Sequence, residues 1–213
     1  MASIPSGRLP RAFDQAEREQ IRARLATIDR RRLPDDVPLA AVVVPLGHRG
    51  GRPAVLFTKR TDTVGTHKGQ VSFPGGRMDT ADRDEIACAL RELAEEVGLL
   101  ADDVEVLGVF HDVMSITGLR VTPVLAYVGD LDLTRLSLGP DEVEDAFALT
   151  LEELIDPRQR ATQLLGDLRA PYFCAGPHPI WGLTALILDE VLREALGLEL
   201  ASPALPDVPS PRR

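Results

Sequence analysis

The sequence predicts an α+β domain in which helices cover a mixed β-sheet. Two observations carry this prediction. Short runs of β-branched residues occur in two groups, and a segment with apolar residues at helical spacing follows each group. The chain has 213 residues, of which 44% are hydrophobic and 27% are charged, and this is sufficient for one globular domain with a sizeable core.

In the first half, a surface helix is expected from Asp14 to Arg32, with Ile21, Leu25 and Ile28 at helical spacing, and "PDDVP" stops it. The runs "PLAAVVVPLG" and "PAVLFTKR" are expected to form a strand pair across the turn "GHRGGRP". A Gly-rich loop follows and ends in the short strand "QVSF". We therefore separate residues 1–34, an N-terminal helical extension, from a domain over 35–200.

In the second half, a central helix is expected from Asp84 to Val97. The runs "VEVLGVFHDV" and "RVTPVLAYVG" are expected to be strands joined by "SITG". The segment "TLEELIDP" predicts a short helix, and "IWGLTALILDEVLREALG" predicts a long apolar one. Residues 201–213 are Pro-rich, and this composition predicts a disordered tail.

Composition limits the classes of function. The net charge of −9 argues against a nucleic-acid binder, and it suits an acidic small-molecule substrate only if cations intervene. Two cysteines without metal-ligand spacing predict reduced thiols and a cytoplasmic location. The N-terminus lacks the apolar core of a secretory signal, and no run of about 18 apolar residues predicts a membrane span. Whether the chain is a monomer or a homodimer stays open.

The central helix has two distinct faces. One is an apolar stripe that is expected to pack on the sheet: Ile86, Leu90, Leu93 and Val97. The other carries Glu92, Glu95 and Glu96, whose like charges repel at this spacing. Three carboxylates near a Gly-rich loop offer the oxygen ligands that Mg²⁺ prefers, and a cation would relieve the repulsion. The alternative is a solvated acidic face paired with Arg91.

The order of these residues resembles the Nudix box of hydrolases that act on nucleoside-diphosphate-linked substrates. The matching positions are Gly76, Arg91, Glu92, Leu93, Glu95, Glu96, Gly98 and Leu99. The sequence departs from the pattern at its first acid, which is Asp82 rather than Glu and is separated from Arg91 by eight residues rather than seven. Because Asp82 precedes Glu85 by three residues, as in a capping box, we expect Asp82 to cap the helix; the alternative is that Asp82 orients a water or binds metal.

A second resemblance lies just upstream, in "LFTKRTDTVGTHKGQVSFPGG", which is similar to the signature of the coenzyme A pyrophosphatase branch of that family. The matching positions are Leu56, Thr58, Arg60, His67, Gly69, Phe73, Pro74, Gly75 and Gly76. Gly65 stands where the branch usually has an Arg. The longer spacing in the box is also typical of the branch, and the resemblance extends from about Pro38 to Leu192.

The resemblance implies a Nudix-type α/β/α sandwich with a mixed β-sheet and a Mg²⁺ or Mn²⁺ cofactor. The implied metal ligands are Glu92, Glu96, Glu95 and the Gly76 carbonyl, with Glu142 (or its neighbour Glu144) as an outlying carboxylate. Arg91 would orient a glutamate of the box. Glu92 or Glu95 would be the general base, and the alternative is an acid downstream of the box. Arg60, His67 and Lys68 would bind the phosphates of the substrate or its adenosine 3′-phosphate, and Arg60 would be the preferred contact of the 3′-phosphate.

The reaction implied is hydrolysis of coenzyme A, free, acylated or oxidised, to 4′-phosphopantetheine and adenosine 3′,5′-bisphosphate. Divalent cations would neutralise the pyrophosphate oxygens and lower the pKa of a bound water. One alternative is a Nudix pyrophosphatase acting on ADP-ribose or a dinucleotide polyphosphate. The other is a non-catalytic Nudix-like binding module, against which the intact glutamates argue.

Overall fold

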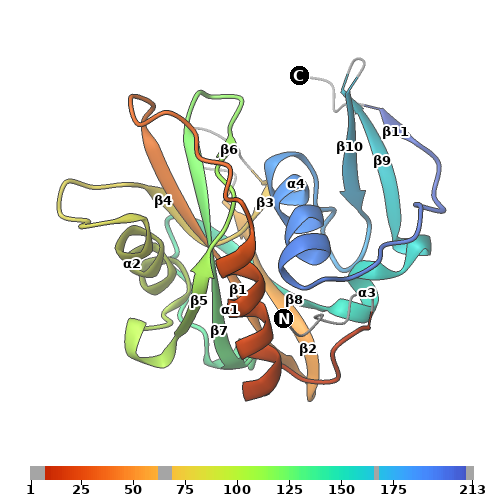
Figure 1. The fold of residues 1–213 in the computed structure, drawn as a ribbon, viewed down its shortest axis with the longest axis horizontal. Coiled ribbons are helices and arrows are strands. Elements are labelled where there is room, and N and C mark those ends of the chain that lie inside the picture. Colours follow the sequence, from red (N-terminus) through yellow and green to blue (C-terminus); the bar gives the residue numbers. More distant parts are fainter. Residues whose placement is uncertain (1–7, 62–68, 166–167, 210–213) are drawn as a thin grey trace.

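A computed structural model describes residues 8–61, 69–165 and 168–209. It contains four α-helices and eleven strands within those ranges (Figure 1). The helices are α1 Gln15–Thr27, α2 Glu85–Val97, α3 Leu151–Ile155 and α4 Gly182–Glu190. The strands are β1 Leu39–Arg49, β2 Arg52–Arg60, β3 Val71–Ser72, β4 Gly75–Arg77, β5 Glu105–Val109, β6 Val113–Met114, β7 Arg120–Asp130, β8 Val143–Thr150, β9 Arg160–Leu165, β10 Leu168–Phe173 and β11 Val208–Pro209.

The main sheet is mixed, as predicted. Its central path is β3-β2-β1-β7-β5, with β4, β6 and β8 paired at its sides. Strands β1 and β7 run parallel, whereas β1 and β2 form the antiparallel pair expected from the sequence. The short β4 pairs with β1 and places the two glycines before α2 beside Ala41 and Val42. The sheet therefore positions the loop that leads into α2.

Helices cover both faces of this sheet. Alternate side chains of β1 point to opposite sides, so that Val44 and Leu46 pack with α1 and α4. Ala41 and Val43 pack instead with the apolar stripe of α2. Figure 1 shows α2 on one side of the sheet and α1 with α4 on the other. This arrangement is the predicted α/β/α sandwich.

The N-terminal helix is shorter than predicted. It begins after its N-cap Asp14 and ends at Thr27, whereas the sequence predicted helix to Arg32. Beyond Ile28 the chain makes tertiary contacts: the N–H of Arg31 donates to Nδ1 of His111 at 3.0 Å, and Arg30 reaches Glu85, the first residue of α2. These partners lie more than 50 positions away, so the local pattern could not reveal them.

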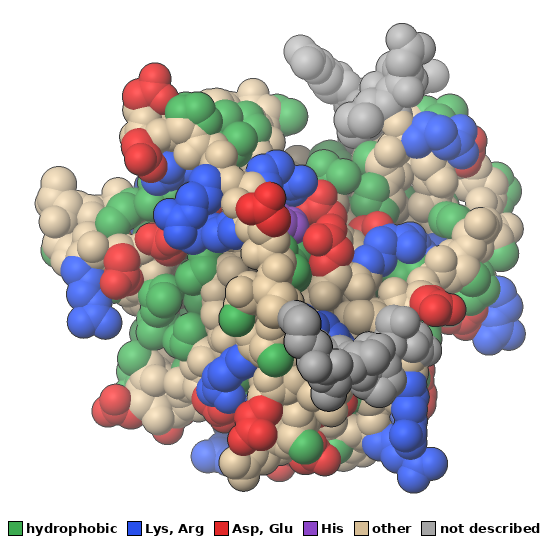
Figure 2. Space-filling model, in the orientation of Figure 1, with side chains coloured by type: hydrophobic (Ala, Val, Ile, Leu, Met, Phe, Trp, Pro, Cys, Tyr) green, Lys and Arg blue, Asp and Glu red, His purple; other side chains and the backbone are tan. Residues whose placement is uncertain are grey.

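One buried carboxylate organises that contact. Asp112, 2% exposed, accepts hydrogen bonds from Arg30, Thr122 and the N–H of Leu33 at 2.8–3.0 Å. Burial alone would raise the pKa of Asp112, but the bonds from these three donors outweigh it and lower the pKa below its usual value. Acidic and basic side chains are interspersed on the face that Figure 2 shows.

The Asp112→Asn variant is expected to lose about 1–3 kcal/mol of unfolding free energy, because an amide leaves at least one buried donor unpaired. Since the pKa of Asp112 is lower in the folded state, the ionised carboxylate adds to the free energy of unfolding above a pH of about 4. This stabilisation disappears as the pH falls through the folded pKa. Urea unfolding at several pH values measures this. Asp35→Asn, at an exposed carboxylate paired with Arg120, is the matched control. Equal losses in both variants would contradict the prediction.

The C-terminal part differs most from the prediction. Where the sequence predicted one long helix, the structure has α4, which continues as a π-helix over Val191–Ala195. A hairpin, β9 and β10, was not predicted at all. Residues 201–209, expected to be disordered, lie against β9: Val208 pairs with Gln163, and the buried guanidinium of Arg160 donates to the Ala201 carbonyl. Backbone pairing of this kind cannot be recognised from a Pro-rich composition.

The division of the chain at residues 34 and 200 stays a prediction.

Among the described residues, no helix is both long enough and apolar enough to cross a membrane. Cys88 and Cys174 are free thiols, and burial raises the pKa of both. The cytoplasmic location expected from them stays a prediction.

Candidate active site at helix α2

Helix α2 begins at a different cap from the one predicted. Asp84, not Asp82, is the N-cap, and its side chain accepts from the N–H of Ala87 at 2.8 Å. At the other end Gly98 adopts the left-handed conformation (φ 75°) and ends the helix. The prediction that Asp82 caps the helix is therefore wrong, and Asp82 has another role in the structure.

The acidic face of α2 is largely buried. Glu96 is 2% exposed and Glu92 is 9% exposed, whereas Glu95 is exposed. A surface of solvated charges, the alternative considered above, therefore does not describe Glu92 or Glu96. Burial raises the pKa of both carboxyls, that of Glu96 to about 8, against the opposing effect of nearby arginines. Keeping two such groups ionised requires positive charge beside them.

Gly76 leaves the space in which the Glu92 carboxylate lies. A Cβ built on Gly76 would come within 2.5 Å of Cδ and 2.6 Å of Oε2 of Glu92, and closer still to Oε1. No side chain larger than hydrogen fits there without displacing that carboxylate. The loop glycine and the helix glutamate therefore depend on each other, which explains why both occur in the sequence pattern.

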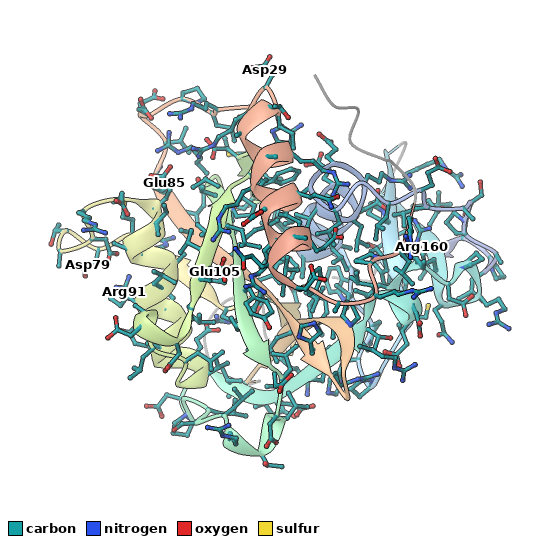
Figure 3. All side chains as sticks on the ribbon, turned by 60° about the horizontal axis from the view of Figure 1, so that its bottom comes forward. Asp29, Asp79, Glu85, Arg91, Glu105 and Arg160 are labelled. Atoms are coloured by element: carbon teal, nitrogen blue, oxygen red, sulfur yellow. The ribbon has the colours of Figure 1, made fainter. Side chains whose placement is uncertain are left out.

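Every N–H of the Arg91 guanidinium donates a hydrogen bond, and most of these bonds go to three carboxylates. Nε and Nη2 donate to the two oxygens of Asp82 at 3.0 and 2.9 Å, and Nη1 donates to Glu92 at 2.9 Å and to Glu95 at 3.0 Å. Nη2 also donates to the Arg77 carbonyl at 3.2 Å. The bonds from Arg91 are the main cause that lowers the pKa of Asp82 to about 2. Figure 3 shows Arg91 on α2, on the same side of the molecule as Asp79.

The Asp82→Asn variant is expected to lower kcat about tenfold, because an amide cannot accept from both Nε and Nη2, and Arg91 then holds Glu92 and Glu95 less firmly. Asp84→Asn, two residues on, is the matched control: Asn caps a helix about as well as Asp, so kcat and Tm should stay near those of the wild type. Steady-state kinetics and thermal melts measure both. Equal kcat in the two variants would contradict the role given to Asp82.

Arg60 lies among the carboxylates. Its guanidinium is 3.4 Å from Glu96 Oε1 and 3.3 Å from Glu142 Oε2. The loop that carries Glu142 is bonded to the C-terminal end of α2, where the N–H of Gly139 donates to the Glu96 carbonyl at 3.0 Å. A cavity of about 170 Å³ opens between helix and loop. Its lining residues are Glu92, Glu95, Glu96, Gly139, Pro140, Asp141 and Glu142.

The predicted site residues are thus brought together in part. Glu92, Glu95, Glu96, Arg91, Gly76, Glu142 and Arg60 meet around α2 and this cavity. Glu144 instead pairs with Lys59 at 2.6 Å. His67 and Lys68 lie outside the described residues. The contribution of Gly139, Pro140 and Asp141 was missed, although the turn signal "GPD" before Glu142 could have indicated it.

The donor set suits a divalent cation. Among the described residues, no three His, Cys, Asp or Glu side chains converge as a preformed metal cluster, and Glu96 and Glu92 are paired with Arg60 and Arg91. Glu96 Oε2, however, is buried and has no hydrogen-bond partner in the described structure. Such an unpaired carboxylate oxygen costs free energy, and a hard cation with oxygen ligands would satisfy it.

Comparison with known proteins identifies similar chains. A family model described as "NUDIX domain" matches residues 37–168. The chain is 39% identical over 201 residues to mitochondrial coenzyme A diphosphatase NUDT8 of Mus musculus. The alignment covers 91% of this chain and 96% of the mouse protein. For the Homo sapiens protein of the same name the identity is 42% over 160 residues, and the alignment covers 72% of this chain and 68% of the human protein. The structure resembles a NUDIX hydrolase from Nitrosomonas europaea with a TM-score of 0.51 at 16% identity, covering 84% of this chain and 82% of that one.

Proposed function

Because this chain belongs to the Nudix family, we propose that it hydrolyses the pyrophosphate of coenzyme A, or of its acylated or oxidised forms, to 4′-phosphopantetheine and adenosine 3′,5′-bisphosphate. The observation that carries the hydrolytic role is the pair of buried glutamates, Glu92 and Glu96, beside a glycine that leaves room for one of them. The substrate is supported by the mouse and human relatives, which are named coenzyme A diphosphatases. It is also supported by the upstream segment that resembles the coenzyme A branch.

A divalent cation is typical of this family. We assign its ligands to the two buried glutamates, the Gly76 carbonyl and, from the facing loop, Glu142; Mg²⁺ and Mn²⁺ both suit such oxygens. When bound, a divalent cation neutralises pyrophosphate oxygens and lowers the pKa of a coordinated water.

The remaining residues orient and accept protons. Arg91 holds Glu92 and Glu95 through a single nitrogen, Nη1, and therefore sets the distance between the two carboxylates. Glu95 is the exposed member of the three, and its carboxylate can reach a water at the mouth of the cavity. We therefore assign the general base to Glu95 and keep Glu92 as a ligand.

The cationic residues upstream serve the phosphates. Arg60 lies beside the carboxylates, so its contact is with the pyrophosphate rather than with the 3′-phosphate of the substrate. The contact of His67 and Lys68 with the 3′-phosphate stays a prediction. This phosphate carries close to two negative charges at neutral pH. A guanidinium suits phosphate oxygens because its N–H groups form a planar fork.

A substrate panel tests the proposal. We would measure kcat/KM with Mg²⁺ and with Mn²⁺ for coenzyme A, its 3′-dephosphorylated form, ADP-ribose and a dinucleotide polyphosphate. The expected result is the highest kcat/KM for coenzyme A, with a higher KM after loss of the 3′-phosphate. A higher kcat/KM for ADP-ribose or the dinucleotide would reject coenzyme A as the substrate, and no hydrolysis of any of them would favour a binding module.

A further inference from the structure

Arg60 links two carboxylates that come from different parts of the chain. It ends β2, Glu96 lies on α2, and Glu142 lies in the loop before β8. Backbone bonds join the loop to both other segments: the N–H of Gly139 donates to the Glu96 carbonyl on α2, and the N–H of Thr61, next to Arg60, donates to the Glu142 carbonyl at 3.0 Å. The backbone therefore holds Glu96, Glu142 and Arg60 together.

The bonds that Arg60 makes are nevertheless long. Its distances of 3.4 Å to Glu96 and 3.3 Å to Glu142 exceed the usual 2.7–2.9 Å of a charge-assisted bond, whereas Arg91 binds Asp82 and Glu92 at about 2.9 Å. Within the described part of the chain, Glu96 Oε2 has no partner at hydrogen-bond geometry, although the nearby N–H of Gly75 helps to lower the pKa of this carboxyl against the larger effect of burial. Arg60 thus balances the charge of Glu96 without satisfying its hydrogen-bonding capacity.

Arg91 cannot take over this task, because all its N–H groups are occupied by Asp82, Glu92, Glu95 and the Arg77 carbonyl. Among the described residues, Arg60 is consequently the cationic partner of both Glu96 and Glu142. A guanidinium and a divalent cation compete for the same carboxylate oxygens, since both need them as their negative partner.

We propose that Arg60 is a built-in competitor for the metal site. Arg60 holds Glu96 and Glu142 while no divalent cation is bound, and so limits their repulsion. It gives up these carboxylates when a cation binds, and its planar fork is then available for the pyrophosphate oxygens. Arg60 therefore weakens metal binding and strengthens substrate binding. Only the claim about substrate binding rests on the proposed function; the claim about metal binding does not.

The test measures metal binding directly, without substrate. Free Mn²⁺ is followed by electron paramagnetic resonance during titration of the full chain, for the wild type and for Arg60→Gln. The variant is expected to bind Mn²⁺ about threefold to thirtyfold more tightly, since it removes two ion pairs that compete with the cation. In the same variant kcat/KM for coenzyme A should fall, so that the two readouts move in opposite directions.

Two further variants make the result decisive. Arg83→Gln removes the same charge from an exposed side chain in the loop before α2, and it should leave the Mn²⁺ affinity near that of the wild type. Arg60→Met is a second neutral variant, which serves if Arg60→Gln does not fold. Unchanged or weaker Mn²⁺ binding in the folded Arg60 variant would overturn the inference, as would equal tightening in Arg83→Gln. Failure of the proposed function would instead appear as a wild type that binds Mn²⁺ but hydrolyses none of the substrates.

Discussion

Replacing either buried glutamate of α2 by glutamine is expected to lower kcat at least about 100-fold. Glu92→Gln and Glu96→Gln each keep the shape of the side chain but remove the negative charge that a divalent cation and its bound water require. Both positions border the cavity between α2 and the Glu142 loop. Steady-state kinetics with saturating Mg²⁺ measures the effect.

Stability should not fall with activity. Burial raises the pKa of Glu96 to about 8, so folding at neutral pH must either protonate this carboxyl or bury its charge, and both cost free energy; an uncharged glutamine should therefore leave Tm unchanged or raise it. Glu85→Gln is the matched control, since Glu85 lies at the start of the same helix, pairs with Arg30 and is outside the cavity. A loss of kcat smaller than tenfold in both Glu92→Gln and Glu96→Gln would show that these residues are not central to the reaction.

The Gly76→Ala variant is expected to lower kcat about 10- to 100-fold while the protein remains folded. Its Cβ would collide with the carboxylate of Glu92, and the carboxylate is the flexible end of a long side chain. The steric conflict is therefore relieved by moving Glu92 out of its position rather than by moving the backbone. Kinetics and a thermal melt of the same preparation measure the two consequences.

The neighbouring glycine provides the contrast. A Cβ on Gly75 would meet the backbone of β1, at 2.6 Å from Cα of Val42 and closer to the Ala41 carbonyl oxygen. Gly75→Ala should therefore destabilise the fold, by about 1–3 kcal/mol, as overpacking against rigid atoms does. If Gly76→Ala retained full kcat, or lost as much stability as Gly75→Ala, the placement of Glu92 against Gly76 would be contradicted.

Features encoded by local patterns could be predicted from the sequence. The strand pair β1–β2 follows from two β-branched runs across a turn, and α2 follows from an apolar stripe that ends at Gly98. The association of Gly76 with Glu92 was predictable only through the order of residues in the Nudix box. The cause, a missing Cβ, becomes visible in the structure.

Features that depend on distant partners could not be predicted. The cap of α2 was placed at Asp82 because the spacing to Glu85 fits a capping box, but Arg91 binds Asp82 and the cap is Asp84. The burial of Glu96 depends on the loop that carries Glu142, more than 40 positions away. The tail over 201–209 is held by backbone bonds to β9, which composition does not report.

The most direct measurement is turnover of coenzyme A by the metal-free protein, before and after a divalent cation is restored. The protein is stripped with chelator, and 4′-phosphopantetheine and adenosine 3′,5′-bisphosphate are quantified by chromatography. We expect no turnover in excess chelator, recovery on addition of Mg²⁺ or Mn²⁺, and equal amounts of the two products. Undiminished turnover in chelator would contradict a cation held by Glu92 and Glu96.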